Sequence, residues 1–327
     1  MNTLKPNYNS ILVALATGSL VWLAGASPAV AQRTPTATLL ASGLQGPIGS
    51  TIGPDGALYV PEGPIGRVSR VDLDTGAVTT FASGLPAQLI PLGGAMDIAF
   101  VDNTAYVLVT LVDTNLGGNS IDGIYRIDGP SSFTVVADIG AFAVENPPPP
   151  IFPIQAPTGV QFAMQPYHGG FLVTDGHHNR VYFAQLDGQV SQVIQFDDIV
   201  PTGLALKGNT VYLAEAGPIP HLPQDGLVVS FVPGDTSVTT VASGAPLNVG
   251  VQFGPGHRLY ALAQGHWSDD VAGTPADPNT GMLMKADDGI FTPIVTGLDR
   301  PTSFQVIVHT AYVVTLTGEV WKIDHLP

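Results

Sequence analysis

The stretch Thr38-Leu39-Leu40-Ala41-Ser42-Gly43-Leu44 decides the fold, because variants of it return three times later in the chain. The later copies begin at Thr79, Thr239 and Thr292, and each of them ends a repeat. The first copy stands before any repeat has begun. The last repeat, ending at Trp321-Lys322-Ile323-Asp324, stops where its own copy would be expected. The N-terminal strand is therefore predicted to complete the C-terminal unit and to close a ring without exposed sheet edges.

A second repeated element gives the number of units. It is a turn of small residues followed by an apolar strand that contains an aromatic residue, and its six copies begin at Gly53, Val101, Gly169, Lys207, Gly254 and Val308. Spacings of roughly 40 to 65 residues are typical of propeller blades with loop insertions. With 38 glycines and 29 prolines in 327 residues, no amphipathic helix is expected after the N-terminal segment. The predicted fold is an all-β, six-bladed β-propeller.

Residues 1–31 have the pattern of a cleavable secretory signal, and residues 32–327 are predicted to form the propeller domain. Lys5 precedes the apolar run Ile11–Ala26, and Ala29-Val30-Ala31 is a small-x-small cleavage site. The run is short for a membrane span, although an uncleaved anchor stays open as an alternative. The mature chain is thus expected to be secreted or periplasmic, with no membrane span.

Composition restricts the partners. The chain contains no cysteine, so the ring must be stable without disulfides. Lys5 is the only charged residue of the signal segment, and its removal changes the formal net charge from −15 to −16. Such a charge disfavours nucleic acid and anionic membrane surfaces. It is compatible with a neutral or cationic small-molecule ligand, or with a protein of the cell envelope. We expect a monomer.

Loop lengths predict which face carries the site. In a four-stranded antiparallel blade, the loops between the second and third strands lie on the same face as the connections between blades. Nearly all long insertions belong to these two classes: residues 86–93, 111–122, 143–156 (with Pro147–Pro150) and 263–280. Long loops in compact folds are commonly functional. We call this side the long-loop face and place the binding site there.

Three carboxylates follow the aromatic strand at the same repeat position, namely Glu62, Asp175 and Glu215. They could surround a cation or orient a polar ligand, or they could bind loop backbone and cap turns. Val109 and Ala263 occupy this position in the second and fifth repeats, so the set is incomplete.

Histidine, glutamine and tryptophan side chains extend the candidate ligand-binding set in neighbouring loops. These residues are His177, His178, Gln264, His266 and Trp267. Histidine beside carboxylates suits acid–base chemistry or metal binding, although adjacent histidines on a turn are often surface residues. Trp267, expected on an exposed loop, would offer a flat aromatic surface to a ligand. Catalytic residues are not assigned, because no nucleophile elbow, phosphate loop, dinucleotide fingerprint or His-Glu-x-x-His motif is present.

The stretch Val173-Thr174-Asp175-Gly176-His177-His178-Asn179-Arg180-Val181-Tyr182 resembles the NHL repeat, and the starts Pro157-Thr158-Gly159 and Pro201-Thr202-Gly203 fit that repeat's opening. The signal segment, the Ala-Ser-Gly-Leu blade ends, Gly53-Pro54-Asp55-Gly56-Ala57-Leu58-Tyr59-Val60 and the closing Gly318-Glu319-Val320-Trp321-Lys322-Ile323 resemble the ScyD/ScyE proteins of cyanobacteria. That resemblance implies an NHL- or SMP-30-like propeller associated with periplasmic steps in the synthesis of scytonemin, an indolic–phenolic pigment.

The gluconolactonase and regucalcin propellers are the nearest enzymes for comparison, and they hold a divalent metal in the central channel. The corresponding openings here are expected at Ile48, Met96, Thr158, Thr202, Val249 and Thr302, with Asp97 and Asn248 as the only polar neighbours. Hard cations need about six oxygen ligands, so no metal and no cofactor is predicted.

The leading functional hypothesis is a propeller that binds a small, partly aromatic ligand or a partner on its long-loop face. One alternative is an enzyme that uses the same face, either as a metal-assisted hydrolase or as a catalyst of indole–phenol coupling. Another is an interaction module of the cell envelope.

Overall fold

The structure is a computed structural model, and it describes Met1 and residues 34–149, 156–269, 271 and 273–327. The chain divides into two units, Met1–Gln32 and Arg33–Pro327. Apart from Met1, the predicted signal segment 1–31 lies outside the described residues, so its cleavage stays a prediction. No helix in the described ranges is both long and apolar enough to cross a membrane.

The second unit is all-β, and its strands form four-stranded antiparallel groups, here called blades one to six. Blade one contains β2 (Thr51–Ile52), β3 (Leu58–Glu62), β4 (Arg67–Val71) and β5 (Val78–Ser83). Blade two contains β6 (Gly94–Val101), β7 (Thr104–Thr110), β8 (Gly123–Gly129) and β9 (Ser132–Asp138). Blade three contains β10 (Gln161–Tyr167), β11 (Gly170–Asp175), β12 (Arg180–Gln185) and β13 (Val190–Gln195).

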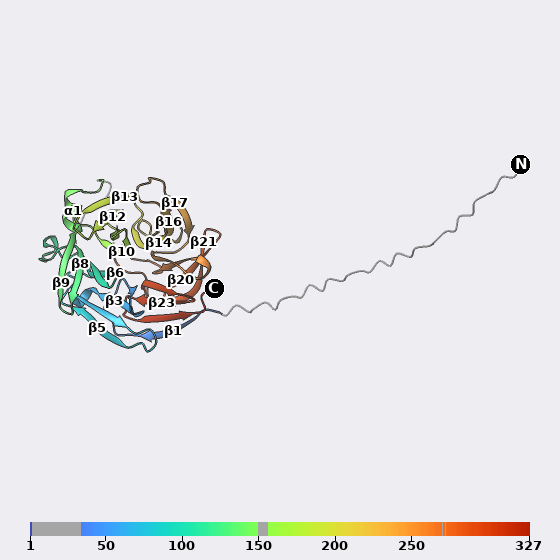
Figure 1. Ribbon diagram of the computed structural model, residues 1–327, viewed down its shortest axis with the longest axis horizontal. Coiled ribbons are helices and arrows are strands. Elements are labelled where there is room, and N and C mark those ends of the chain that lie inside the picture. The colour runs from blue at the N-terminus through green and yellow to red at the C-terminus, as the bar shows by residue number, and fades with distance from the viewer. Residues whose placement is uncertain (2–33, 150–155, 270, 272) are drawn as a thin grey trace. The chain divides into compact units, whose positions relative to one another are not determined.

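Blade four contains β14 (Pro201–Lys207), β15 (Thr210–Glu215), β16 (Leu227–Phe231) and β17 (Thr239–Ser243). Blade five contains β18 (Asn248–Phe253), β19 (Leu259–Ala263), β20 (Gly281–Asp287) and β21 (Ile290–Leu298). A single parallel pair, Ser243 with Ile290, joins these two blades into one eight-stranded sheet. Blade six contains β22 (Pro301–Ile307), β23 (Thr310–Thr315), β24 (Val320–Asp324) and β1 (Thr36–Ala41). The sheets surround a common centre (Figure 1), and the predicted β-propeller fold is confirmed.

The N-terminal strand completes the last blade, as the displaced repeat predicted. β1 pairs antiparallel with β24, with Thr36 opposite Asp324 and Leu39 opposite Trp321. Leu44, which follows β1, donates its N–H to the carbonyl of Gly318 at 3.1 Å. The first and last strands therefore lie in the same sheet, and the outer edge of β24 is covered.

Apolar side chains from adjacent blades form the core. Each second strand alternates, so successive residues face the preceding and the following blade. Tyr59 shows the packing, because its ring meets those of Phe81 and Phe100 edge-on at 4.9 Å between centroids. Phe100 belongs to blade two, so this contact fixes the first two blades against each other.

The expectation that the propeller contains no helix is wrong at one place. Helix α1 (Ile139–Glu145) lies in the long connection between blades two and three. Asp138 accepts the N–H of Ala141 and caps its first turn, while Ile139 and Ala143, four residues apart, are both buried. The described residues also form four short 3-10 turns: η1 (Gly63–Ile65), η2 (Thr114–Leu116), η3 (Pro223–Asp225) and η4 (Pro255–His257).

Candidate functional site in the central channel

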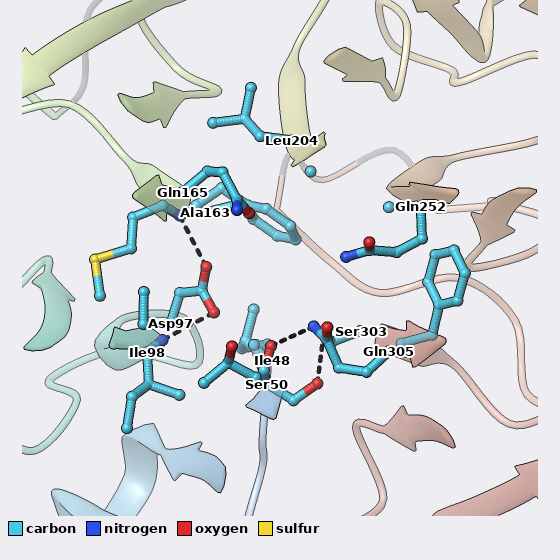
Figure 2. Close-up of a pocket in the computed structure, with 18 of the residues that line it drawn as sticks. Ile48, Ser50, Asp97, Ile98, Ala163, Gln165, Leu204, Gln252, Ser303 and Gln305 are labelled. Atoms are coloured by element: carbon cyan, nitrogen blue, oxygen red, sulfur yellow. Dashed lines mark hydrogen bonds between the residues drawn. The ribbon is translucent and has the colours of Figure 1, made fainter. Parts of the chain in front are cut away.

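A cavity of about 210 Å³ occupies the channel between the first strands of the blades. Its lining residues come from all six of these strands and their approaches, and none comes from the long loops. Among them, three phenylalanines supply apolar surface, and polar side chains supply hydrogen-bonding groups (Figure 2). The cavity thus combines aromatic walls with a few polar groups, as small-molecule sites commonly do.

At one level along the channel axis, the residue that faces the cavity differs from blade to blade. Strand pairing places Asp97, Gly250 and Ser303 at this level. Counting along the other first strands from their printed pairs gives the counterparts Gly49, Ala163 and Gly203. Asp97 is the only carboxylate among the cavity-lining residues of the described chain. A Cβ on Gly49 would collide with the Asp97 carboxylate, so the absence of a side chain there makes room for it.

Asp97 links two blades, and its carboxyl group has a raised pKa. Its two carboxylate oxygens accept the N–H groups of Ile98 and Met164, each at 2.8 Å, and Met164 belongs to the next blade. Burial raises the pKa of Asp97 to about 7, although these two hydrogen bonds favour the ionised form. The carboxyl can therefore exist in either protonation state near neutral pH, where it could accept a hydrogen bond, pair with a cation or exchange a proton.

Amide and hydroxyl groups surround the remaining wall of the cavity. Gln305 donates to the carbonyl of Ser50 at 2.6 Å, and the hydroxyls of Ser50 and Ser303 lie 2.8 Å apart. Gln165 and Gln252 project from blades three and five toward the cavity (Figure 2). Neither side-chain amide makes a hydrogen bond to another residue in the described part of the chain. Their donors and acceptors are therefore available to water or a ligand.

Glu62, the first of the predicted carboxylates, is fully buried and is bound by the protein. Its oxygens accept from Arg67 at 2.8 Å, from the hydroxyl of Ser69 and from the N–H of Gln45 at 2.7 Å. Gln45 lies in the connection from blade six to blade one. This carboxylate thus holds the closing connection in place, which agrees with the backbone-binding alternative for the acidic positions.

Asp175 is likewise the centre of a buried network. It accepts the N–H groups of Val160 and His178 and the hydroxyl of Tyr182, at 3.0, 2.9 and 2.8 Å. Arg180 in turn donates to the Tyr182 hydroxyl at 2.7 Å. Burial alone would raise the pKa of Asp175, but the hydrogen bonds and the charge of His178 lower it to about 2.

The two adjacent histidines have different surroundings. His178 is fully buried, and its ring lies within hydrogen-bonding distance of the Ala156 carbonyl, 3.1 Å, and of Arg180, 3.0 Å. His177 is partly buried, and its backbone N–H reaches Asp175 at 3.2 Å. Burial lowers the pKa of His177. His178 therefore connects the Asp175 network to the connection between blades two and three.

Glu215 occupies the same repeat position but has no hydrogen-bonding partner among the described residues. Only 3% of it is exposed, and burial raises its pKa to about 7. Two of the three equivalent acids, Glu62 and Asp175, therefore accept hydrogen bonds from other residues, and the third, Glu215, does not.

Trp267 is buried, so the expectation that it lies exposed on its loop is wrong. Its indole N–H donates to Thr274 at 3.1 Å, and its ring meets that of His221 edge-on at 5.2 Å. The loop after β19 is long enough to form a small core of its own with Ala216 and Leu247. A ligand-binding role for Trp267 stays a prediction.

The other two predicted residues of this loop differ in exposure. Gln264 is buried and accepts the N–H of Ala276 at 2.9 Å, whereas the side chain of His266 is exposed. The loop also approaches another long loop, because a Cβ placed on Gly273 would lie 4.0 Å from Leu92 Cδ2. Blade five is not a neighbour of blades one and two, so these loops reach toward each other over the long-loop face.

Within the described ranges, no group of three or more histidine, aspartate or glutamate side chains could hold a metal ion. Asn248 is fully buried, and its amide donates to the carbonyl of Leu227 at 2.8 Å. The channel position in blade three belongs to Phe162 rather than Thr158, because β10 begins at Gln161. The prediction that the protein binds no metal and no cofactor stays a prediction.

The sequence reasoning missed the polar channel residues Ser50, Gln165, Gln252, Ser303 and Gln305. The available signal was three glutamines at equivalent positions in three first strands, four residues after Gln161, Asn248 and Pro301 respectively. A repeated amide on a strand that would otherwise be apolar indicates a polar environment.

No protein-family model matches the chain, and no curated protein matches it. Solved structures do resemble it. A gluconolactonase from Xanthomonas campestris has a TM-score of 0.61 and 13% identity, covering 92% of this chain and 93% of its own. Virginiamycin B lyase from Staphylococcus aureus has a TM-score of 0.55 and 14% identity over 89% and 99%. A PQQ-bound aldose sugar dehydrogenase from Streptomyces coelicolor has a TM-score of 0.55 and 14% identity over 89% and 98%. At these identities the similarity establishes the β-propeller fold alone.

Proposed function

We propose that the protein binds a small polar molecule containing one aromatic ring in its central channel. The observation that carries the proposal is the pair Gln165 and Gln252, whose amides face the cavity without a hydrogen bond to the described protein. Polar groups left unpaired toward a cavity gain free energy when a ligand supplies matching donors and acceptors.

The size of the cavity sets the size of the ligand. An apolar cavity of about 150 Å³ accommodates one benzene molecule, and this cavity measures about 210 Å³. One substituted ring therefore fits, and a two-ring molecule would have to extend beyond the cavity. Phe100, Phe162 and Phe304 line the walls, so the ring has aromatic neighbours.

Asp97 sets the preferred charge. An anionic ligand would face the carboxylate without a lysine or arginine among the cavity-lining residues. A hydroxyl or ammonium group would instead donate to it. The ligand class supported best is therefore a single-ring phenol, alcohol or amine.

An enzyme is the second candidate, and the pKa of Asp97 favours it. A carboxyl whose pKa lies near 7 can give or take a proton at neutral pH, which suits general acid–base catalysis on a ligand bound in the channel. Turnover of a bound ligand that is lost in Asp97→Asn would support this candidate.

The proposed site of action is outside the cytoplasm, as the segment 1–31 and the resemblance to ScyD/ScyE proteins suggest. Pigment-related chemistry on single-ring phenolic or amine precursors would be compatible with the channel. Fractionation of an expressing bacterium, with N-terminal sequencing of the protein found, tests the location: protein outside the cytoplasm that begins at Gln32 supports it, and protein confined to the cytoplasm contradicts it.

Calorimetric titration with 4-hydroxybenzylamine, 4-hydroxybenzyl alcohol and 4-hydroxybenzoate tests the binding proposal. We expect the amine and the alcohol to bind and the benzoate to bind at least about tenfold more weakly. The variant Gln165→Ala/Gln252→Ala should weaken binding, whereas Gln189→Ala, an exposed glutamine outside the channel, should not. Equal affinity in the double variant, or no binding of any probe, would refute the proposal.

A further inference from the structure

The second strands of blades one, three and four end in an acidic residue at the same position: Glu62, Asp175 and Glu215. This internal repetition allows each acid to be compared with two others in the same chain. All three acids precede loops of the long-loop face, and none of them lines the channel cavity.

In blade one, two positions of the third strand neutralise the acid. Arg67, directly opposite Glu62, donates to it at 2.8 Å. Ser69, two residues later, donates through its hydroxyl. A cation and a hydroxyl thus satisfy the buried carboxylate, which would otherwise be costly.

In blade three, the residues at the same two positions form a chain of hydrogen bonds that ends at the acid. Arg180 lies opposite Asp175, and Tyr182 lies two residues later. The Tyr182 hydroxyl donates to Asp175 at 2.8 Å and accepts from Arg180 at 2.7 Å. The cation that directly faces Asp175 is His178, whose Nδ1 lies 3.2 Å from it, whereas Arg180 acts through Tyr182. Each of these two acids therefore has a third-strand hydroxyl donor and a nearby cation.

In blade four, both partner positions are apolar. Leu227 lies opposite Glu215, and Val229 lies two residues later. Glu215 is nonetheless 97% buried, since only 3% of it is exposed. Leaving a buried polar group unsatisfied costs about 1–3 kcal/mol, and such groups in native proteins are rare. Neither Glu215 oxygen is among the fully buried side-chain atoms that lack a hydrogen-bonding partner, so the carboxyl group keeps contact with solvent while no described residue donates to it. A ligand can therefore reach it.

The neighbouring groups limit what such a ligand can be. A lone carboxylate cannot hold a divalent cation, which takes six or more oxygens, and no acidic or histidine cluster of three exists among the described residues. Burial is the sole cause of the raised pKa of Glu215, so no cationic side chain of the described residues lies close to it. An organic cation with N–H donors satisfies both the charge and the hydrogen-bonding need.

The position of the carboxylate locates the site. Glu215 alternates with Leu213 and Val211, which pack against blade three, so its side chain lies on the blade-three side of β15. The next residue, Ala216, packs with Trp267 and Val200. By the same alternation, Ala216 faces the opposite side of the strand from Glu215, so the Trp267 cluster adjoins the end of β15 rather than the carboxyl group itself.

We propose that Glu215 anchors a second ligand site, at the long-loop face between blades three and four, which takes the ammonium group of a small organic amine. The ammonium takes the place of the cation found beside the other two acids, Arg67 in blade one and His178 in blade three. Apolar side chains on the same side of β15 as Glu215, such as Leu213, would contact the organic part of such an amine.

Binding of phenethylammonium and methylammonium, measured by calorimetry and by the ¹³C shift of the Glu215 carboxyl at pH about 8, tests the proposal. We expect both to bind, phenethylammonium more tightly, and Glu215→Gln to weaken binding by about tenfold or more. Leu227→Arg, which supplies the donor found in blade one, should also abolish the binding event that shifts the Glu215 carboxyl signal, while raising the melting temperature. Tetramethylammonium, which lacks N–H donors, should bind more weakly than methylammonium.

Asp97→Asn is the control that distinguishes this site from the channel. Amine binding that survives Asp97→Asn and is lost in Glu215→Gln supports the second site. Binding lost only in Asp97→Asn assigns the amine to the channel and overturns the proposal. So does the absence of binding by every probe, or unchanged affinity in the folded Leu227→Arg protein.

Discussion

Truncation of Leu44 tests ring closure most directly. Leu44 follows the N-terminal strand, is 4% exposed and packs in a cluster that contains Val60 of blade one and Val320 of blade six. It therefore fills the seam at which the two ends of the chain meet. Leu39 lies on the N-terminal strand itself and is 48% exposed. It therefore provides a matched control, because the same leucine-to-alanine change there removes little buried surface.

The burial of each leucine sets the expected loss of stability. Truncating a buried leucine to alanine costs about 2–5 kcal/mol, from lost transfer free energy and the cavity left behind. Leu44→Ala is expected toward the lower part of this range because the seam adjoins the surface. Leu39→Ala should cost less than about 1 kcal/mol. At about 2–4 °C per kcal/mol for a large domain, the melting temperatures should differ by roughly 4–10 °C.

Urea unfolding followed by circular dichroism, together with thermal melts, measures both variants. Deleting residues 32–44 is the stronger perturbation, because it exposes the outer edge of β24 and opens the same cluster. We expect that protein to aggregate or to melt far below the parent. Equal losses for Leu44→Ala and Leu39→Ala, or a deleted protein that stays monomeric and melts within a few degrees of the parent, would refute the closure argument.

Three further predictions concern buried acids and the loop core. The folded-state pKa values of Asp97 and Glu215, about 7, exceed ordinary unfolded values near 4, so their contribution to stability should fall as pH rises from about 4 to 7. Urea unfolding across that range should show a shallower decline in Asp97→Asn and Glu215→Gln, and an unchanged slope would contradict the assignment. The low pKa of Asp175, about 2, predicts stability that is lost as pH falls from about 4 to 2; an Asp175→Asn protein that keeps the parent's acid transition would exclude this. Trp267→Ala should destabilise the protein by about 2–4 kcal/mol, and a loss below about 0.5 kcal/mol would show that the loop core does not support the fold.

The fold could be predicted because its determinants are local and repeated. The phrase beginning at Thr38 matches the ends of later repeats, and its displacement to the N-terminus required a partner strand at the C-terminus. The observed pairing of Leu39 with Trp321 follows from that argument. Turn residues and alternating strands likewise recur in each blade. A strand or turn that is ambiguous in one repeat can therefore be assigned from its counterparts in the others.

Features that depend on loops could not be predicted in this way. Helix α1 has only seven residues, and its stability comes from the Asp138 cap and from packing of Ile139 and Phe142 against blades two and three rather than from a long periodic pattern. The burial of Trp267 arises from contacts with a second long loop. Position Phe162 was misassigned to Thr158 because the connection between β9 and β10 is longer than its counterparts, which shifts the alignment by four residues.

The candidate acids illustrate how much chemistry a repeat can reveal once its register is known. Position equivalence made Glu62, Asp175 and Glu215 look alike in the sequence, yet their roles depend on the strand opposite. The opposing residues Arg67 and Arg180 each follow their acid by five positions, whereas Leu227 follows Glu215 by twelve, because of these three blades only blade four has a long loop between these strands. The strand register supplied the missing comparison.

Asp97 and Glu215 depart from the repeat in different ways, and the difference decides what each can do. Asp97 replaces a small residue but accepts two N–H groups and joins blades two and three, so its carboxylate has a structural role beside any ligand. Glu215 keeps the repeat's acid while both of its protein donors are replaced by apolar side chains. A purely structural acid would gain nothing from that arrangement, because a buried carboxyl without a donor reduces stability. Substitution should therefore lower stability at Asp97 and raise it at Glu215, so the loss of a ligand in a stabilised Glu215 variant could not be attributed to unfolding.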